Sequence, residues 1–404
     1  MSSPNRILEG VRIIAFTTGY AGPYAGRLLA QYGAEVIKVE SFPGGLDTFR
    51  HYGAEGDINA APRFIECNLA IRSMTVNIKH DDGKRIIKEL AAKANAVLVN
   101  FRPQVLGRLG LGDDELRKVN PSIIILKLPG LGETGPKNWY GTWGFNLNSF
   151  SGMTYLWNHP GQDRPIGSQG VYPDHLGFIS APTIMMAALL RQKLTGKGCS
   201  IDVSQGEVTA YTLGTSYLES SINGVDPQPQ GNRSLTAAPH GCYRCQGDER
   251  WCVVSVNSDD EWRRLCGVMG NEALAGDSRF ATCVDRRRHA DELDAVMSDW
   301  LATQTVEDVA HRLQAAGVPA GVVQNGTDLC NDPQLRHRDY FQKYDDSPIG
   351  PFELPRGGII FRDMPEEEIP ITPPLGEHTE QVMRDVLGYD EAAIAKWKEE
   401  GVLV

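Results

Sequence analysis

The chain lacks a long apolar segment and lacks an excess of positive charge. None of its 404 residues belongs to a hydrophobic run near the roughly 20 residues that cross a membrane, and the opening MSSPNRILEG has no apolar stretch typical of a signal peptide. Lysine and arginine number 40 against 51 aspartates and glutamates, so the formal net charge is −11. We therefore expect a cytoplasmic protein whose main partner is neither nucleic acid nor a membrane. A small anionic ligand stays compatible with this composition if a few cations gather locally.

Cysteine is sparse, and its spacing indicates neither a disulfide framework nor a complete zinc site. The eight cysteines are scattered from Cys67 to Cys330, and in a cytoplasmic chain we expect most of them to be free thiols. Cys242 and Cys245 form a C-x-x-C pair beside His240, but no clear second pair of ligands accompanies them. The surrounding alternation predicts a β-hairpin over 242–256. We expect no bound metal.

The first half also lacks the usual glycine motifs for phosphate binding. VRIIAFTTGYAGPYAGRLLAQYGAEVIKVE, residues 11–40, has the pattern of a strand, a glycine-bearing turn, a helix and a second strand. Its glycines, Gly19, Gly22 and Gly26, do not have the G-x-G-x-x-G spacing, and the phosphate-loop lysine pattern is absent. We place Pro23 at the first helical position. On this stretch alone, a ligand-free turn and an anion-binding helix start are both open.

Alternating strand-like and helix-like runs predict an open α/β sheet in the first half of the chain. Helices are expected over 24–33, 81–94 and 113–119, and a further long helical segment over 175–194, which Pro182 would open or kink. A turn, a strand and a second helix follow this segment. The expected strands of the sheet are 11–16, 35–40, 73–78, 96–100 and 122–128.

The composition changes after this half and suggests a second, smaller domain. Residues 223–240 are rich in Pro, Gly, Asn and Ser, as in a linker or a crossover loop. We expect a large domain over 1–222, a small α+β domain over 241–330 and a return to the large domain over 331–404. Within the small domain, the patterns predict helices near 259–269, 287–301 and 305–316 and a returning strand in AGVPAGVVQN.

Five segments, found in order along the chain, resemble the class III CoA-transferases, the group of formyl-CoA transferase, carnitine CoA-transferase and the acyl-CoA racemases. They are AGPYAGRLLAQYGAEVIKVE, VNFRPQVLGRLGLG, NPSIIILKLPGLGETGP, VYPDHLGFISAPTIMMAALLRQKLTGKGCSIDVS and PPLGEHTEQV. The resemblance implies a Rossmann-like large domain, a smaller α+β domain and an interlocked homodimer. It also implies coenzyme A, carried by an acyl-CoA, and a carboxylic acid as substrates, with no permanently bound cofactor.

The resemblance assigns roles to individual residues. Asp174 falls on the catalytic aspartate, which would pass through a mixed anhydride and an aspartyl-CoA thioester. Ser41 replaces a frequent arginine, so one phosphate contact of the family is missing. The positions that match CoA-binding ones are Tyr20, Ala21, Val76, Lys79, Asn100, Phe101 and Arg108.

Alternatives stay open at this point. Asp174 has the position of a helix N-cap, and His175 beside it is taken as a bystander. A 2-methylacyl-CoA racemase or epimerase would need a second base, yet the family's histidine position falls on Trp143, whose indole has no basic lone pair. A non-catalytic CoA-binding subunit of a heteromeric transferase is the third possibility.

The sequence does not identify the acyl group of the substrate. The glycine-rich lid of formyl-CoA transferase has no match near 233–241, which argues against formate or oxalate as substrates. An aromatic segment that brackets the acyl side either lines an apolar pocket or belongs to the core. We favour a hydrophobic or medium-length carboxylate. The aromatic residues are Trp139, Tyr140, Trp143, Phe145 and Tyr155.

Overall fold

The computed structural model describes residues 6–41, 45–168, 170–364 and 367–403. The chain forms two compact units. The larger unit comprises residues 1–154, 168–225 and 339–404, and the smaller unit comprises 155–167 and 226–338. Residues 155–167 and 331–338, which we expected within the large domain, therefore group with the smaller unit.

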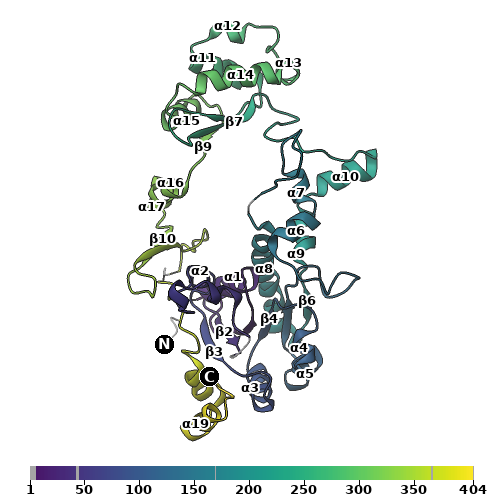
Figure 1. Cartoon of the computed structure of the whole chain (residues 1–404), viewed down its shortest axis with the longest axis vertical. Helices are drawn as coiled ribbons and strands as arrows, with labels where there is room; N and C mark the ends of the chain where they lie inside the picture. Colours follow the sequence, from purple (N-terminus) through teal and green to yellow (C-terminus); the bar gives the residue numbers. More distant parts are fainter. Residues whose placement is uncertain (1–5, 42–44, 169, 365–366, 404) are drawn as a thin grey trace. The chain divides into compact units, whose positions relative to one another are not determined.

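A six-stranded parallel sheet forms the centre of the larger unit, in the strand order β3-β2-β1-β4-β5-β6 (Figure 1). This is the doubly wound Rossmann order, in which the direction of strand addition reverses between β1 and β4. The strands are β1 Arg12–Phe16, β2 Glu35–Glu40, β3 Arg72–Thr75, β4 Ala96–Val99, β5 Ile124–Lys127 and β6 Ser200–Asp202. The expected fold class is confirmed.

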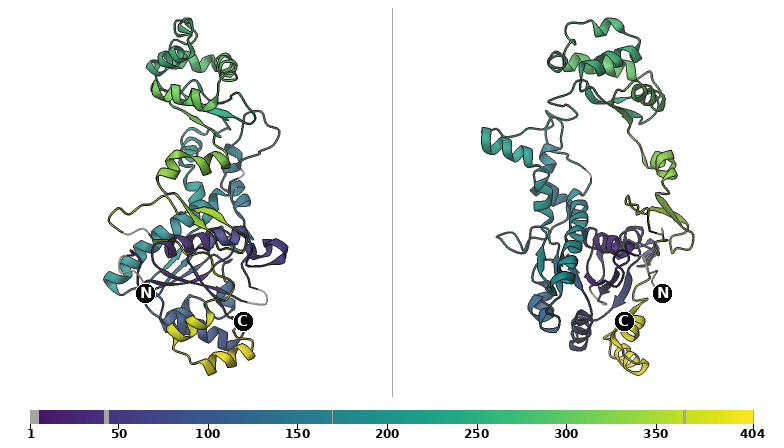
Figure 2. Two further views of the ribbon diagram at one scale, coloured as in Figure 1. Left: turned by 90° about the vertical axis from the view of Figure 1, so that its left-hand side faces the viewer. Right: turned by 180° about the vertical axis from the view of Figure 1, so that it is seen from behind.

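Both faces of this sheet are covered, which explains its nearly continuous apolar strands. Alternate residues of β1 point to opposite cores: Ile13 packs with α1 and α8, and Ile14 packs with α3 and the C-terminal helices. Figure 2 shows the C-terminal segment beside the sheet from two further sides. The covering helices are α1 Ala21–Gln31, α3 Asp81–Ala92, α5 Asp113–Val119, α8 Tyr172–Thr195, the π-helical turn η3 Val382–Leu387 and α19 Glu391–Glu399.

Shorter elements complete the larger unit. An antiparallel hairpin, β10 Phe341–Tyr344 with β11 Phe352–Pro355, packs through Tyr344 on Ile65 and Leu69. The short helices are η1 Thr48–Tyr52, η2 Ala54–Gly56, α2 Pro62–Cys67, α4 Val105–Arg108, α6 Gly144–Phe150, α7 Met153–Leu156 at the boundary with the smaller unit, α9 Gln205–Tyr211, α10 Gly214–Asn223 and α18 Thr379–Gln381.

The smaller unit has an antiparallel sheet, β7-β8-β9, packed against helices around its own core. Trp262 and Phe280 lie in that core and are almost fully buried. Its elements are β7 His240–Arg244, β8 Trp251–Ser255, α11 Asp259–Met269, α12 Glu272–Ala275, α13 Cys283–Arg288, α14 Ala290–Leu301, α15 Val306–Ala315, β9 Ala320–Val322, α16 Gly326–Asn331 and α17 Pro333–His337. Within the described residues, no helix combines the length and the apolarity needed to cross a membrane.

Two helix starts differ from the expected ones. Helix α1 begins at Ala21, so Pro23 is its third residue and not its first. Proline fits there because the first-turn N–H groups have no intrahelical acceptor. Helix α8 begins at Tyr172 and continues past Pro182 to Thr195, which places Asp174 inside its first turn. Asp174 is therefore not an N-cap residue, and Val171 occupies that position.

A buried ionic network lies below the loop between β1 and α1. The Lys38 ammonium is 2.7 Å from the Asp47 carboxylate and also donates to the Thr17 carbonyl oxygen at 2.9 Å. Arg50 forms a second buried pair with Glu40 at 2.8 Å. The Glu40 carboxylate also accepts the Asp47 N–H at 2.9 Å, so the two pairs form one network. Each charge is fully buried and hydrogen-bonded, which is the condition under which a buried ion pair is tolerated.

We expect Asp47→Ala to destabilise the larger unit by about 3–5 kcal/mol, because it leaves the Lys38 ammonium buried without a counter-charge. Urea unfolding, followed by amide hydrogen exchange in β1, β2 and β4, measures this loss. Lys84→Ala is the matched control: its pair with Asp81 is exposed, and its removal should cost less than about 1 kcal/mol. Equal effects of the two variants would contradict the role given to the network.

Candidate active site

The loop after β1 is held by two side chains from other segments: Asn100, which directly follows β4, and Asp47, which precedes η1. The Asn100 amide accepts the Thr18 N–H and donates to the Thr18 carbonyl, both at 2.8 Å. Asp47 accepts the Gly19 N–H at 3.0 Å. A Cβ atom on Gly22 would lie 2.4 Å from the Asn100 side chain, so only glycine permits this approach between α1 and the end of β4.

A cavity of about 690 Å³ opens at the carboxyl ends of β1, β2 and β4, on either side of the point where the strand order reverses. This is the place where open α/β sheets bind ligands. Phe16, Val39 and Ile78 give its wall an apolar part. Its polar lining includes Thr18, Ser41, Lys79, Asn100, Arg102 and Arg108.

A second, smaller cavity of about 130 Å³ continues from the first and contains Asp174. The two cavities share much of their lining, so they are neighbouring parts of one cleft. The inner part adds Tyr20, Gln205 and Asp174. The shared residues are Thr18, Thr48, Asn100, Phe101, Arg102, Thr142 and Trp143.

Asp174 has the environment of a reactive carboxylate. Burial raises its pKa to about 6, although a hydrogen bond from the Ala21 N–H favours the charged form. The position near the amino end of α8 also favours a negative charge. A Cβ atom on Gly144 would lie 2.2 Å from Asp174 Oδ2, so the carboxylate has room only because residue 144 is glycine.

His175 points into a different environment. Its Nδ1 lies 2.9 Å from the Val171 carbonyl, so that nitrogen donates and carries the proton. The ring packs 5.2 Å from Tyr20 and 5.4 Å from Phe178. His175 does not line either cavity of the cleft. The geometry agrees with its interpretation as a bystander.

Three cations stand along the outer cavity. Lys79, Arg102 and Arg108 line it, and all three residues are exposed. Among the described residues none of these three charges forms an ion pair. They give a cleft in an acidic protein a local positive field, which suits a phosphorylated ligand.

The structure separates the predicted site residues into three groups. Tyr20, Lys79, Asn100, Phe101, Arg108 and Asp174 line the cleft. Ala21 contributes its backbone N–H to Asp174. Val76 lines neither cavity: its side chain is fully buried in the core, and its backbone pairs with Leu403. The Val76 side chain lies in the same apolar core as those of Met74 and Ile78 and is not a lining residue of the cleft, and a role for Val76 at the ligand stays a prediction.

Sequence reasoning missed Arg102 and Gln205. Arg102 directly follows Phe101 at the end of β4, so its position beside predicted site residues was the available signal. Gln205 begins α9 and is almost fully buried, and its Oε1 has no hydrogen-bond partner among the described residues. No motif indicated Gln205, since its position depends on the packing of α9 against α8.

The C-x-x-C pair lies in and directly after strand β7. Cys242 lies opposite Val253 in the β7–β8 hairpin, and Cys245 is buried. Burial raises the pKa of both thiols, which keeps them protonated and unreactive. In the part of the chain that the structure describes, no three His, Cys, Asp or Glu side chains gather as metal ligands would.

Comparisons with known proteins identify relatives of this chain. The chain is 32% identical over 393 residues to the probable CoA-transferase Rv1866 of Mycobacterium tuberculosis, covering 94% of this chain and 48% of that relative. It is 29% identical to succinyl-CoA–D-citramalate CoA-transferase of Chloroflexus aurantiacus, covering 99% of each chain. It is 28% identical to succinyl-CoA:glutarate CoA-transferase of Mus musculus, covering 98% of this chain and 90% of that one.

A solved structure and a family profile extend the comparison to the fold. The crystal structure of a CAIB/BAIF family protein from Brucella suis superposes with a TM-score of 0.85 at 27% identity, covering 95% of this chain and all of that chain. The profile described as CoA-transferase family III matches residues 8–379, which include both parts of the cleft. The chain is therefore a member of CoA-transferase family III.

Proposed function

We propose that this enzyme transfers coenzyme A from an acyl-CoA to a free carboxylic acid, with Asp174 as the nucleophile. The observation that carries the proposal is the placement of one half-buried carboxylate, with an N–H directed at it, at the inner end of a cleft lined by cations. A thioester that reaches Asp174 from the cleft would leave its phosphates near the outer cations. Carboxylate nucleophiles are an established route for acyl transfer.

The chemistry proceeds in four balanced steps. The Asp174 carboxylate attacks the thioester carbonyl, the C–S bond breaks, and CoA leaves as a thiolate while a mixed anhydride forms. The thiolate attacks the aspartyl carbonyl of the anhydride, which releases the donor acid as a carboxylate and leaves an aspartyl-CoA thioester. The acceptor carboxylate attacks the aspartyl carbonyl of this thioester, the C–S bond breaks, and a second mixed anhydride forms as the thiolate leaves. The thiolate then attacks the acceptor carbonyl, which gives the new acyl-CoA and frees Asp174.

The Ala21 N–H has a specific part in this sequence. When the aspartyl carbonyl is attacked, negative charge develops on an oxygen of Asp174, beside the N–H that already donates to that side chain. Such a preorganised donor contributes about 3–4 kcal/mol to acyl-transfer transition states. The bonds from Asn100 and Asp47 to the preceding loop fix the start of α1 and therefore the direction of this donor.

Lys79, Arg102 and Arg108 are proposed to meet the phosphates of CoA, because they are the cations of the outer cavity. Arg102 supplies a charge that compensates for Ser41, where the family often has arginine. Asn100 is proposed to act mainly through the loop, since its amide already donates to and accepts from Thr18. Phe101 lies at the same strand end and offers an aromatic face to the adenine.

For the acids, we propose succinyl-CoA as the donor and a short dicarboxylate as the acceptor. The relatives from Chloroflexus and mouse carry names with succinyl-CoA and the dicarboxylates citramalate or glutarate. The aromatic residues that we associated with an apolar acyl pocket are exposed, and only Tyr140 and Trp143 of them line the inner cavity. This exposure argues against a closed hydrophobic pocket within one chain.

Racemisation is the less well supported activity. It requires two groups that move protons, and Trp143, at the family's histidine position, has an indole that only donates. Trp143 lines the inner cavity beside Asp174, and among the described residues no histidine, lysine or second carboxylate lines that cavity. A non-catalytic subunit is disfavoured because Asp174 and its N–H donor are both in place.

We further propose that the chain works as a homodimer. Helix α8 buries one apolar face through Phe178, Ala181 and Met185 and also presents apolar side chains to solvent. Helix α10 has no buried residue at all yet carries aromatic and aliphatic side chains. Exposed apolar side chains gathered along two helices support an interface at these helices. The exposed side chains are Ile179, Ile184, Met186, Leu190, Leu194, Tyr217, Leu218 and Ile222.

The nucleophile assignment is tested by trapping. After incubation with succinyl-CoA, hydroxylamine or borohydride should modify Asp174, and peptide mass spectrometry should locate the modification there. Asp174→Asn should reduce turnover by at least a thousandfold and leave CoA affinity within about threefold, because the amide cannot attack and the phosphate contacts stay. Modification of another carboxylate alone, or full activity of the variant, would rule out this role.

The pKa of Asp174 predicts a pH dependence. Since the nucleophile must be charged and burial raises its pKa to about 6, the active fraction falls as pH drops through 6 and is constant well above it. An infrared difference spectrum between wild type and Asp174→Asn, titrated without ligand, follows the carboxyl directly and avoids ionisation of the substrate. A midpoint near 4, the value of an ordinary aspartate, would show that the site does not perturb the group.

Gly144→Ala tests the space around the nucleophile. The added Cβ would lie 2.2 Å from Asp174 Oδ2 and 2.5 Å from Val171 Cβ, so Asp174 must move. We expect kcat to fall at least tenfold with little change in CoA affinity, because small displacements of reacting groups are costly. Gly214→Ala is the control, since no atom lies within 4 Å of its added Cβ. A kcat loss shared by both variants would point to general destabilisation.

A further inference from the structure

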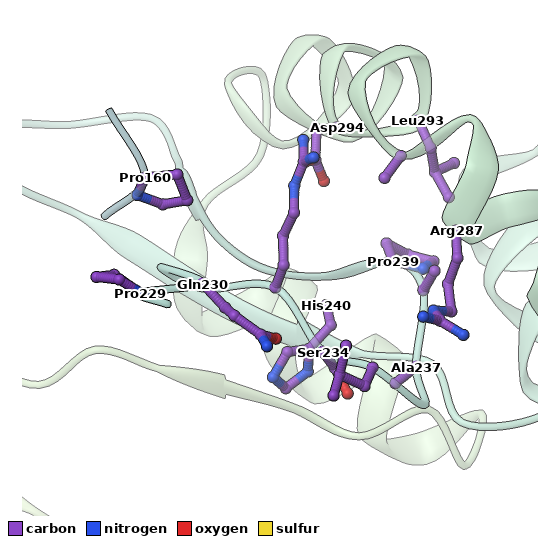
Figure 3. Close-up of a pocket in the computed structure, with 14 residues that line it drawn as sticks. Pro160, Pro229, Gln230, Ser234, Ala237, Pro239, His240, Arg287, Leu293 and Asp294 are labelled. Carbon is purple, nitrogen blue, oxygen red and sulfur yellow. The ribbon is translucent and has the colours of Figure 1, made fainter. Parts of the chain in front are cut away.

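The smaller unit contains a cavity of its own, of about 300 Å³, between the segment 229–240 and helix α14. Figure 3 shows Leu293 and Asp294 on the helix above this cavity and Gln230, Ser234 and His240 below it. Every residue that lines it belongs to the smaller unit. The cavity is therefore defined without reference to the Asp174 cleft.

The wall of this cavity is fixed by buried hydrogen bonds. The Ala238 N–H donates to the Val256 carbonyl at 3.0 Å, and the Val256 N–H donates to the Pro239 carbonyl at 2.9 Å. Arg286, which is fully buried, donates to the Ala238 carbonyl at 2.7 Å and forms an ion pair with Asp259 at 2.9 Å. A wall held at these points is preorganised for a ligand.

The acidic side chains near the cavity are already neutralised. Asp291 and Asp294 both form ion pairs with Arg233. Asp294 also accepts a hydrogen bond from the Tyr243 hydroxyl at 2.8 Å. Arg233 therefore brings no free positive charge to the cavity, and these two aspartates bring no free negative one.

Arg287 is the lining residue with a charge to offer. Among the described residues its guanidinium has neither an ion pair nor a hydrogen bond, and it lines the cavity from the last turn of α13. The Gln230 side chain also has no partner in the described part of the chain. His240 uses Nδ1 toward Ser255, which leaves Nε2 available.

We propose that this cavity is a binding site for a short-chain carboxylate. A guanidinium matches a carboxylate in a two-point geometry, with the Gln230 amide and His240 as further donors. Ala237, Pro239 and Leu293 form an apolar surface for a few methylene groups. The site rests on these residues alone, and only the choice of a dicarboxylate as probe depends on the proposed transferase function.

Calorimetric titration of the full-length protein with glutarate tests the proposal. The titration is made on the Asp174→Asn protein saturated with CoA, so that the transferase cleft is occupied. We expect saturable binding that Arg287→Gln weakens at least tenfold, because the bidentate pair is lost. Arg287 is exposed and without partners, so circular dichroism and thermal unfolding of this variant should match the parent protein.

Arg288→Gln is the matched control. It removes a neighbouring charge that is paired with Asp285 and does not line the cavity, and it should leave binding within twofold. The neutral diamide of glutaric acid should not bind. The proposal is overturned by absence of binding at millimolar glutarate, by equal loss in the two arginine variants, or by equal binding of the diamide. Because the protein tested carries no nucleophile, these outcomes are independent of whether Asp174 catalyses transfer.

Discussion

The buried pair between Lys38 and Asp47 is the interaction on which the cleft around Asp174 depends. Lys38 comes from β2 and bonds to the Thr17 carbonyl at the end of β1, while Asp47 accepts the Gly19 N–H. The two charges therefore join the second strand, the loop after the first strand and the segment that begins η1. The N–H of Ala21, two residues beyond Gly19, is the one that reaches Asp174. A charge pair at the sheet thus helps to set the geometry around Asp174.

The same loop explains how the fold serves coenzyme A without a dinucleotide motif. In dinucleotide-binding proteins, glycines at fixed spacing let the backbone approach a pyrophosphate. Here Gly22 lets helix α1 approach Asn100, and the Asn100 amide bonds to both backbone groups of Thr18. The close approach of α1 to Asn100 therefore fixes the loop. The cations that would meet the phosphates are side chains that line the outer cavity. The Rossmann strand order is retained while the glycine motif is not needed.

The sequence predicted the secondary structure and the fold class better than it predicted the individual residues of the cleft. The strands and long helices of the larger unit follow from short-range apolar patterns, and the fold class follows from their alternation. Asp174 and most of the cleft residues came from the family resemblance. The start of α1 at Ala21 was not predicted, because it depends on where the loop after β1 ends. The inward orientation of Val76 follows from the alternation that places Met74, Val76 and Ile78 in one core. Arg102 and Gln205 depend on packing between distant segments, and the grouping of residues 155–167 with the smaller unit does so too.

Asp174 shows why the surrounding network must be rigid. A pKa raised from 3.8 to about 6 means that ionisation of this carboxyl in the folded protein costs about 3 kcal/mol relative to water. The folded state binds this proton more tightly than the unfolded state does. The stability that comes from the protonated Asp174 carboxyl is therefore present at low pH and is lost as pH rises through 6. At neutral pH the site therefore works against folding. A loose loop would relieve that strain by letting water reach the carboxylate, and its nucleophilicity would fall. The buried pairs at Lys38 and Arg50, together with the Asn100 amide, oppose this relaxation and hold the Asp174 carboxylate at the inner end of the cleft, as the proposed nucleophilic role requires.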